Sequence, residues 1–259
     1  MTVAQQFQTL YQVPESDLYS GQLGQWYSEV MSLDTLDAEI ILNHCSPNAY
    51  VADLMCGDAR ILRWLDSHGC QGVGVDISEA AIKRAKSYTV HNSSFFVSNA
   101  FSWLPSQSVD FVVLGGLVGS MFSEDILKRF LHHIYNFLPS GAGLWLDYLV
   151  EDSNEFWKGD FIFPSANPLD QGFVVSSTVR DSSHGMQESS FFYSPGESTL
   201  DKEFSSHKLF IFPQNRIEEI LIDCGFKIKE SWNSYQFDPD NVDDTVFPSW
   251  PIRKVVALR

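Results

Sequence analysis

Acidic and amide side chains follow apolar runs in the first half of the chain, and their types predict a nucleoside site. Asp53 lies in the run "AYVADLM", just before a turn at Gly57, and Asp76 closes the run "GVGVDI". A carboxylate such as Asp76 can accept hydrogen bonds from both hydroxyls of a ribose. Asn99, after "SSFFVS", offers the acceptor and donors that match the edge of adenine. Asp76 also suits the first turn of a helix and Asn99 a plain turn, so the adenosine interpretation depends on both together.

The loop after Asp53 disfavours a phosphate. It reads "MCGDAR" and has a single glycine, whereas a dinucleotide site needs G-x-G-x-x-G so that the pyrophosphate can approach the backbone. No G-K-[ST] follows, which excludes a P-loop. Asp58 stands where a phosphate would lie, and its carboxylate suits a cationic or zwitterionic group. S-adenosylmethionine, an adenosine that carries a sulfonium and an amino acid, fits these residues.

The elements that must position these residues alternate between strands and helices. Such alternation produces βαβ units and a mostly parallel sheet with helices on both faces. Ligands bind at the carboxyl ends of the strands in such sheets, where the polar residues stand. Strands are expected at 49–55, 72–77, 93–100, 109–117 and 143–149, and helices at 59–69, 78–88 and 123–138.

The pattern changes after residue 149. Residues 151–171 contain Pro164 and Pro168 and are expected to be irregular. Three apolar runs without helices between them then predict an antiparallel β meander, inserted into the α/β fold after its fifth strand. The meander strands are expected at 172–180, 186–194 and 204–212, followed by a helix at 213–225 and strands at 226–232 and 252–259.

At this point the chain resembles the class I S-adenosylmethionine-dependent methyltransferases of the small-molecule type. "VADLMCGDAR" resembles that family's V-x-D-L-x-C-G-x-G-R, and "GVGVDISEAAIKRAK" and "LHHIYNFLPSGAGLWLDYL" resemble later segments. Met55 and Ala59 stand where the family usually has glycine. The resemblance implies a Rossmann-like seven-stranded sheet whose last strand is antiparallel. It also implies a single domain, with an N-terminal helical lid (1–44), an α/β cofactor-binding core (45–150 and 213–259) and a substrate-covering insertion (151–212).

The expected cofactor is S-adenosyl-L-methionine, and the candidate catalytic residues come from two segments. Asp147 and Tyr148 end the fifth strand, and His207 lies in the meander. A general base is needed only where the acceptor must first lose a proton. The four cysteines are scattered without metal-site spacing, so no metal is expected. The cofactor is expected to contact Tyr19, Asp53, Met55, Cys56, Gly57, Asp76, Ile77, Asn99, Ala100, Phe101 and Gly115.

The leading interpretation is methyl transfer to a small-molecule acceptor by in-line displacement at the sulfonium. One alternative keeps the cofactor but uses an internal nucleophile, so that cyclisation or elimination releases methylthioadenosine. A second is a non-catalytic cofactor-binding protein. A nicotinamide dehydrogenase is disfavoured because G-x-G-x-x-G is missing.

Charge and hydropathy limit the partners. The formal net charge of −16 disfavours binding to nucleic acid, which depends on Lys and Arg at the phosphates, and docking on an anionic membrane. The N-terminal residues do not resemble a secretory signal, and no apolar run approaches the roughly 20 residues that span a bilayer. A cytoplasmic monomer or homodimer that acts on a small molecule is expected.

Overall fold

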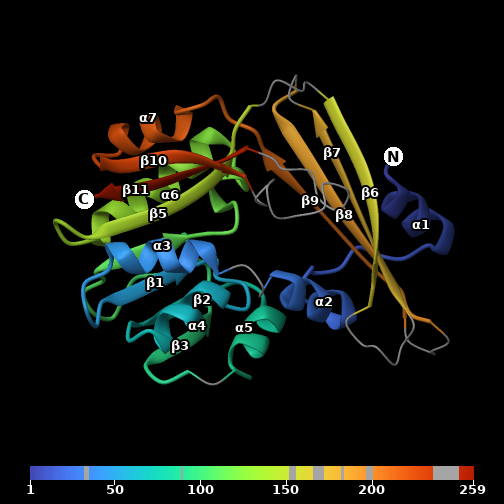
Figure 1. Ribbon diagram of the computed structural model, residues 1–259, viewed down its shortest axis with the longest axis horizontal. Coiled ribbons are helices and arrows are strands. Elements are labelled where there is room, and N and C mark those ends of the chain that lie inside the picture. Colours follow the sequence, from blue (N-terminus) through green and yellow to red (C-terminus); the bar gives the residue numbers. More distant parts are fainter. Residues whose placement is uncertain are drawn as a thin grey trace. The chain divides into compact units, whose positions relative to one another are not determined.

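The computed structural model describes residues 1–31, 35–88, 90–151, 156–165, 172–181, 184–196, 201–235 and 251–259. The chain forms two compact units (Figure 1). The parallel-sheet unit consists of Asp34–Glu151 and Phe210–Arg259, and the insertion unit consists of Met1–Leu33 and Asp152–Leu209. None of the helices in these described ranges is both long and apolar enough to cross a membrane.

The parallel-sheet unit contains the expected seven-stranded sheet, in the order β10-β11-β5-β4-β1-β2-β3. The strands β1 to β5 run parallel, and β11, the last strand of the chain, is antiparallel to both of its neighbours. The prediction of a mostly parallel, Rossmann-like sheet is therefore confirmed. The strands are β1 (Tyr50–Leu54), β2 (Gln71–Asp76), β3 (Ser93–Val97), β4 (Phe111–Leu114), β5 (Gly143–Leu149), β10 (Lys227–Tyr235) and β11 (Pro251–Leu258).

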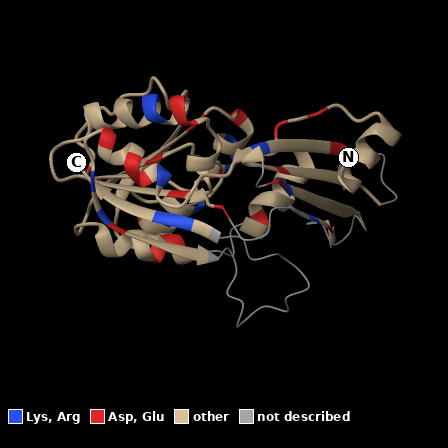
Figure 2. Ribbon diagram, turned by 90° about the horizontal axis from the view of Figure 1, so that it is seen from above, with Lys and Arg blue, Asp and Glu red and all other residues tan. Residues whose placement is uncertain are grey.

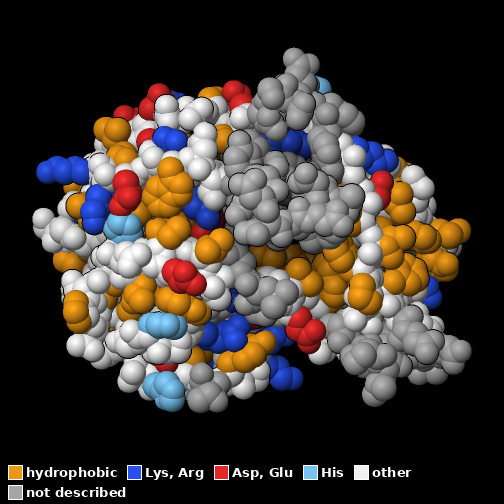
Figure 3. Space-filling model, in the orientation of Figure 1, with side chains coloured by type: hydrophobic (Ala, Val, Ile, Leu, Met, Phe, Trp, Pro, Cys, Tyr) orange, Lys and Arg blue, Asp and Glu red, His pale blue; other side chains and the backbone are white. Residues whose placement is uncertain are grey.

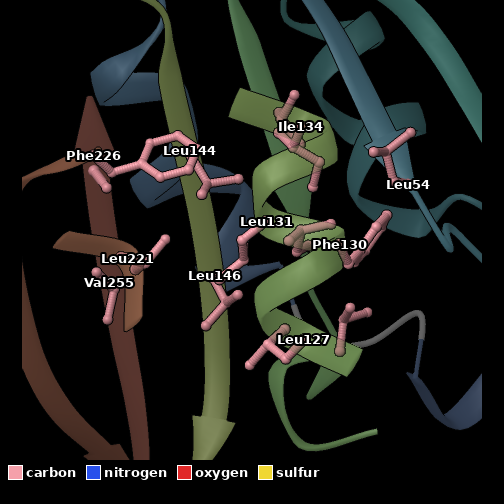
Figure 4. Packing of buried hydrophobic residues seen from close by; sticks show 14 of the residues in the cluster. Leu54, Leu127, Phe130, Leu131, Ile134, Leu144, Leu146, Leu221, Phe226 and Val255 are labelled. Atoms are coloured by element: carbon pink, nitrogen blue, oxygen red, sulfur yellow. The ribbon is translucent and has the colours of Figure 1, made fainter. Parts of the chain in front are cut away.

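Helices cover both faces of this sheet (Figure 1). The helix α6 (Glu124–Phe137) is amphipathic, and it turns four apolar side chains toward the strands: Leu127, Phe130, Leu131 and Ile134 (Figure 4). Residues at this spacing lie on one face of a helix. Burying each such side chain contributes about 1.5–3 kcal/mol. One face packs against α3 (Leu36–His44), α4 (Arg60–Ser67) and α5 (Glu79–Ala85), and the other against α6 (Glu124–Phe137) and α7 (Arg216–Asp223).

Because β5 is buried on both faces, its alternate side chains enter different cores. Leu144, Leu146 and Tyr148 pack on the α6 and α7 side, whereas Trp145 packs on the α3 and α4 side. Successive side chains of a strand point to opposite faces. Asp147 therefore faces away from Tyr148, and these two candidate catalytic residues lie on different sides of the sheet.

The insertion unit contains a four-stranded antiparallel sheet in the order β6-β7-β8-β9. The predicted meander is confirmed, but the expectation that 151–171 are irregular is wrong for residues 156–164, which form β6. This strand lies at the edge of the sheet and ends at Pro164, a position where proline is tolerated. Residues 152–155 and 166–171 lie outside the described residues. The strands are β6 (Phe156–Pro164), β7 (Phe173–Asp181), β8 (Met186–Ser194) and β9 (Glu203–Phe210).

Two N-terminal helices cover opposite faces of the insertion sheet. A capping box of Thr2 and Gln5 begins α1 (Val3–Tyr11), which packs against Phe192 and its neighbours. The helix α2 (Gly21–Met31) packs Leu23 and Trp26 on the other face. The N-terminal segment is thus divided, because α3 belongs to the parallel-sheet unit, and the lid role of residues 1–44 stays a prediction.

Acidic and basic residues are interspersed along the helices and strands of each unit (Figure 2). On the face drawn in Figure 3, hydrophobic side chains gather over the insertion unit. Exposed apolar residues of that unit include Leu10 at 70%, Tyr11 at 49% and Ile162 at 72% exposure.

Candidate active site

The carboxyl ends of β1 and β2 bring three carboxylates together around one short loop. Asp53, Asp58 and Asp76 are only 3%, 6% and 8% exposed. After burial itself, these three carboxylates are the causes that raise the pKa of the Cys56 thiol well above its usual range. Cys56 is therefore a neutral thiol, packed on the α4 side of the sheet, and the loop that carries it lies in a strongly acidic environment.

Backbone hydrogen bonds attach this loop to the end of β2. The Gly57 N–H donates to Asp76 Oδ2 at 2.8 Å, and the Ser78 N–H, at the N-cap of α5, donates to Asp76 Oδ1 at 2.8 Å. The Met55 N–H donates to the Val75 carbonyl at 2.7 Å. Each oxygen of a carboxylate has two lone pairs, so Asp76 can accept further hydrogen bonds from a ligand.

The same loop has an unusual backbone. Met55, Gly57 and Ala59 all have positive φ values of 61°, 55° and 61°. For residues other than glycine this conformation is strained, and such strain gathers at ligand sites. Met55 and Ala59 thus keep the backbone that glycine would favour. The Met55 side chain packs against the core on the α6 side and Ala59 against the core on the α4 side.

Ala59→Gly is expected to stabilise the protein by about 0.5–1 kcal/mol, because glycine adopts a positive φ without strain. Met55→Gly is expected to be tolerated, since relief of strain offsets the lost packing. The matched control is Ala81→Gly, another fully buried alanine but in helix α5, which is expected to destabilise by about 1 kcal/mol. Urea unfolding measures all three, and an Ala59→Gly variant as unstable as Ala81→Gly would contradict the strain.

The two carboxylates of the first loop differ in their partners. Burial raises the pKa of Asp53 to about 7, although the positive charge of Arg60 opposes this shift. Asp58 Oδ2 lies 3.3 Å from Arg63 Nη2, and the guanidinium of Arg63 lies 3.5 Å from the centre of the Tyr88 ring. The positive charge of Arg63 therefore neutralises that of Asp58, whereas the Asp53 carboxyl is partly protonated near neutral pH.

The end of β3 adds an amide. Asn99 Oδ1 accepts a hydrogen bond from the Phe101 N–H at 2.9 Å, which turns the amide nitrogen outward as a donor. Ala100 is buried, and the Phe101 ring stacks on Phe130 with centroids 4.4 Å apart. Ile77, directly after Asp76, is 75% exposed. Ile77 therefore places an exposed apolar side chain directly beside the buried Asp76.

Gly115 and Tyr19 are placed differently from the other expected cofactor residues. A Cβ at Gly115 would lie 2.6 Å from Ile61 Cδ1 of α4, so any side chain there would require the end of Ile61 to shift. Tyr19 belongs to the insertion unit, where its ring contacts Tyr27 edge-on at 5.7 Å. The structure brings the remaining expected residues together at the carboxyl edge of β1, β2 and β3.

The candidate catalytic residues of β5 make internal hydrogen bonds. Asp147 is 3% exposed and accepts hydrogen bonds from the Gly116 and Leu117 amides. Tyr148 is fully buried, and its hydroxyl donates to Glu218 in α7; burial and this carboxylate raise the pKa of Tyr148 far above its usual range. Glu218 was missed by sequence reasoning, because the helix pattern gives no sign that an acidic residue faces inward.

His207 belongs to the insertion unit, whereas Asp147 and Tyr148 belong to the parallel-sheet unit. Its ring stacks on Phe191 with centroids 5.8 Å apart. Burial lowers the pKa of His207 to about 4, so the imidazole is neutral at physiological pH. The described residues hold no group of three or more His, Cys, Asp or Glu side chains that could bind a metal ion.

An open α/β sheet with ligand groups at the carboxyl ends of its first strands defines a class of nucleoside-binding enzymes. Residues 51–141 match the family described as a methyltransferase domain. Residues 51–141 therefore contain a methyltransferase domain, as the resemblance implied, and the chain has the fold of S-adenosylmethionine-dependent methyltransferases. A comparison with curated proteins finds no match.

Solved structures share the fold over nearly the whole chain. A S-adenosylmethionine-dependent methyltransferase from Clostridium acetobutylicum is 14% identical, with a TM-score of 0.66 over 90% of this chain and 95% of that one. A sugar N-methyltransferase from Streptoalloteichus is 17% identical, with a TM-score of 0.66 over 95% and 98%. An amino pentose methyltransferase from Micromonospora echinaspora, solved with S-adenosylmethionine bound, is 12% identical, with a TM-score of 0.65 over 95% and 100%.

Proposed function

We propose that this chain binds S-adenosylmethionine at the carboxyl edge of β1, β2 and β3 and transfers its methyl group to a small-molecule acceptor. The observation that carries the proposal is the set of buried carboxylates Asp53, Asp58 and Asp76 in a methyltransferase domain. A pyrophosphate would be repelled by these groups, whereas the ammonium and sulfonium of S-adenosylmethionine are attracted. These three carboxylates therefore fit this cofactor and not a dinucleotide.

Each part of the cofactor has a matching group. The Asp76 carboxylate, which accepts hydrogen bonds from the Gly57 and Ser78 amides, suits the ribose hydroxyls, because a carboxylate can accept hydrogen bonds from both of them. The outward amide nitrogen of Asn99 suits a ring nitrogen of adenine, and exposed Ile77 suits its face. Bound S-adenosylmethionine supplies a methyl group already activated on sulfur. The protein then contributes mainly orientation and exclusion of water, which are worth about 7–11 kcal/mol in well-aligned reactions.

For the acceptor we infer an amine-bearing, sugar-like small molecule. Support comes from two structural neighbours described as amino pentose and sugar N-methyltransferases. A neutral amine needs no base before the displacement, and a pKa of about 4 makes the buried His207 imidazole a weak base. The Tyr148 hydroxyl is already bonded to Glu218, so proton removal by His207 or Tyr148 stays a prediction. The cytoplasmic location and the monomeric or homodimeric state stay predictions.

The deciding experiment has two stages. Calorimetry with S-adenosylhomocysteine tests the cofactor site. Absence of binding would contradict the proposal that the protein uses S-adenosylmethionine. Incubation with S-adenosylmethionine and a panel of amino sugars and aromatic amines then tests the reaction. S-adenosylhomocysteine as product indicates methyl transfer, whereas methylthioadenosine indicates cyclisation or elimination.

The affinity for S-adenosylmethionine is expected to rise with pH. A bound cation favours ionised Asp53, whose pKa of about 7 means that binding releases a proton near neutrality. Between pH 6 and 8 the affinity gains at most about tenfold from this group. Calorimetry in two buffers of different ionisation enthalpy measures the proton release, and Asp53→Asn is expected to remove it. Equal proton release in both proteins would show that Asp53 is not near the cofactor.

The stability of the free protein should change in the opposite direction. The pKa of Asp53 is higher in the folded chain than in the unfolded chain, so the folded chain binds more protons between about pH 4 and 7. This contribution to stability is present at low pH and is lost as the pH rises through that window. Thermal unfolding with and without S-adenosylmethionine at each pH separates the two effects.

A further inference from the structure

The loop that follows β4 has two consecutive residues in the left-handed conformation. Gly116 has φ of 78° and Leu117 has φ of 67°. Their amides converge on the Asp147 carboxylate of β5, at 3.1 Å from Oδ2 and 2.6 Å from Oδ1. Consecutive amides arranged in this way form a concave anion site. Here a side chain of the same sheet occupies it and supports the strained Leu117.

A second contact holds the same loop on β5. The Leu149 N–H donates to Ser120 Oγ at 2.8 Å, and Ser120 is fully buried. At Gly119 a Cβ would lie 2.8 Å from the Asp147 carbonyl oxygen, so the backbones approach too closely for any side chain. The loop from Gly115 to Ser120 is therefore held against β5, and its conformation depends on the hydrogen bonds that Asp147 and Ser120 accept.

Two charged groups face Asp147 from neighbouring elements. Lys254 is its register partner on β11, and Lys254 Nζ donates to Asp37 Oδ1 of α3. Asp37, Asp147 and Lys254 are 4%, 3% and 9% exposed. Burial and the charge of Asp37 raise the pKa of Asp147 to about 7, while the two amides and Lys254 oppose this shift. Lys254 thus donates a hydrogen bond to Asp37, and its positive charge also acts on Asp147.

We propose that Asp147 is a positioning residue, and not the general base, which fixes the loop after β4 in the conformation that binds S-adenosylmethionine. The inference rests on the proposed function, because the carboxyl edge of β4 adjoins that of β1 in the sheet. Asp147 acts through the Gly116 and Leu117 amides, and the charge of Lys254 favours its ionised form. Each oxygen accepts a hydrogen bond from a backbone amide and the side chain is 3% exposed, a geometry that suits an anchor for the loop.

Asp66 provides a matched control in the same unit. It is also 3% exposed, and its two oxygens accept hydrogen bonds from the His91 and Asn92 amides, each at 2.8 Å. It lies in the last turn of α4, and its amide partners precede β3, away from the carboxyl ends of the strands. Asp66→Asn and Asp147→Asn therefore make the same side-chain change and weaken the same kind of hydrogen bond. They differ in whether the loop concerned lies at the proposed cofactor edge.

The test measures S-adenosylhomocysteine affinity by calorimetry and amide exchange by NMR. Asp147→Asn is expected to weaken binding at least about tenfold and to speed exchange at Gly116 and Leu117. Asp66→Asn is expected to destabilise the fold but to leave the affinity of the folded protein unchanged. Equal affinity in Asp147→Asn and the wild type would overturn the inference. Failure of the wild type to bind would instead overturn the proposed function.

If Asp147→Asn does not fold, an NMR titration of the isotope-labelled wild-type protein tests the inference instead. On titration with S-adenosylhomocysteine, the amide signals of Gly116 and Leu117 are expected to shift, and those of His91 and Asn92 to stay. Unmoved signals at Gly116 and Leu117, with binding seen by calorimetry, would show that the loop plays no part in the cofactor site.

Discussion

Asp76→Ala is expected to weaken the binding of S-adenosylmethionine about 10- to 100-fold, because the ribose hydroxyls lose charged hydrogen bonds worth about 1.5–3 kcal/mol. The variant also frees the Gly57 and Ser78 amides, which removes the attachment of the first loop to β2. Calorimetry with S-adenosylhomocysteine measures the loss. It should exceed that of any other single substitution at this edge, since no second carboxylate ends β2.

The matched control for Asp76→Ala is Asp110→Ala. Asp110 precedes β4 and accepts a hydrogen bond from the Tyr50 N–H at 2.8 Å, at the amino end of the same sheet. It is expected to alter thermal stability but not cofactor affinity. Wild-type affinity in a folded Asp76→Ala protein would mean that the ribose lies elsewhere. The proposed cofactor site at the carboxyl edge of β1, β2 and β3 would then be wrong.

Removal of the insertion unit is expected to preserve cofactor binding and to slow methyl transfer about 100-fold or more, because an open site loses orientation and exclusion of water. The shortened chain would join residues 34–151 to 210–259. The junction is favourable, since the Phe212 N–H donates to the Leu149 carbonyl at 3.0 Å and the Glu151 N–H to the Phe212 carbonyl at 3.0 Å. Circular dichroism, calorimetry and a product assay are needed in that order.

Tyr19→Ala in the full chain serves as the control, because Tyr19 is the expected cofactor residue that the deletion would remove. A loss of affinity in both proteins would assign it to Tyr19. A loss in the deletion alone would make another part of the insertion unit belong to the cofactor site. The division of roles between the two units would then be wrong.

The parallel sheet could be predicted because its signals are local. Each of the strands β1 to β5 is an apolar run, and Asp53 and Asp76 stand where strand ends must lie. The edge strand β6 was missed because Pro164 at its end and Pro168 after it indicate a loop, whereas in the structure β6 pairs with β7 as an extended strand. Tertiary pairing of this kind leaves no periodic pattern in one sequence.

The internal bonds of the site residues could not be predicted for a similar reason. Asp147 reads as a carboxylate at a strand end, which is equally compatible with a base and with an anchor for backbone amides. The distinction depends on Gly116 and Leu117, thirty residues away along the chain. Likewise, the Arg63 that balances Asp58 looks like an ordinary surface residue of a helix.

The edge of the insertion sheet has a consequence for synthesis on the ribosome. Ser16 covers β9 by donating from its backbone N–H to the Phe204 carbonyl at 2.9 Å, and these partners are 188 residues apart. At about 5–20 residues per second, the N-terminal segment waits roughly 10–40 s before β9 has been made. Leu23 and Trp26 have no sheet to cover until β7 and β8 have been made. The first helices of the insertion unit therefore carry exposed apolar side chains for most of synthesis, and chaperones that hold apolar helices would meet them before the sheet exists.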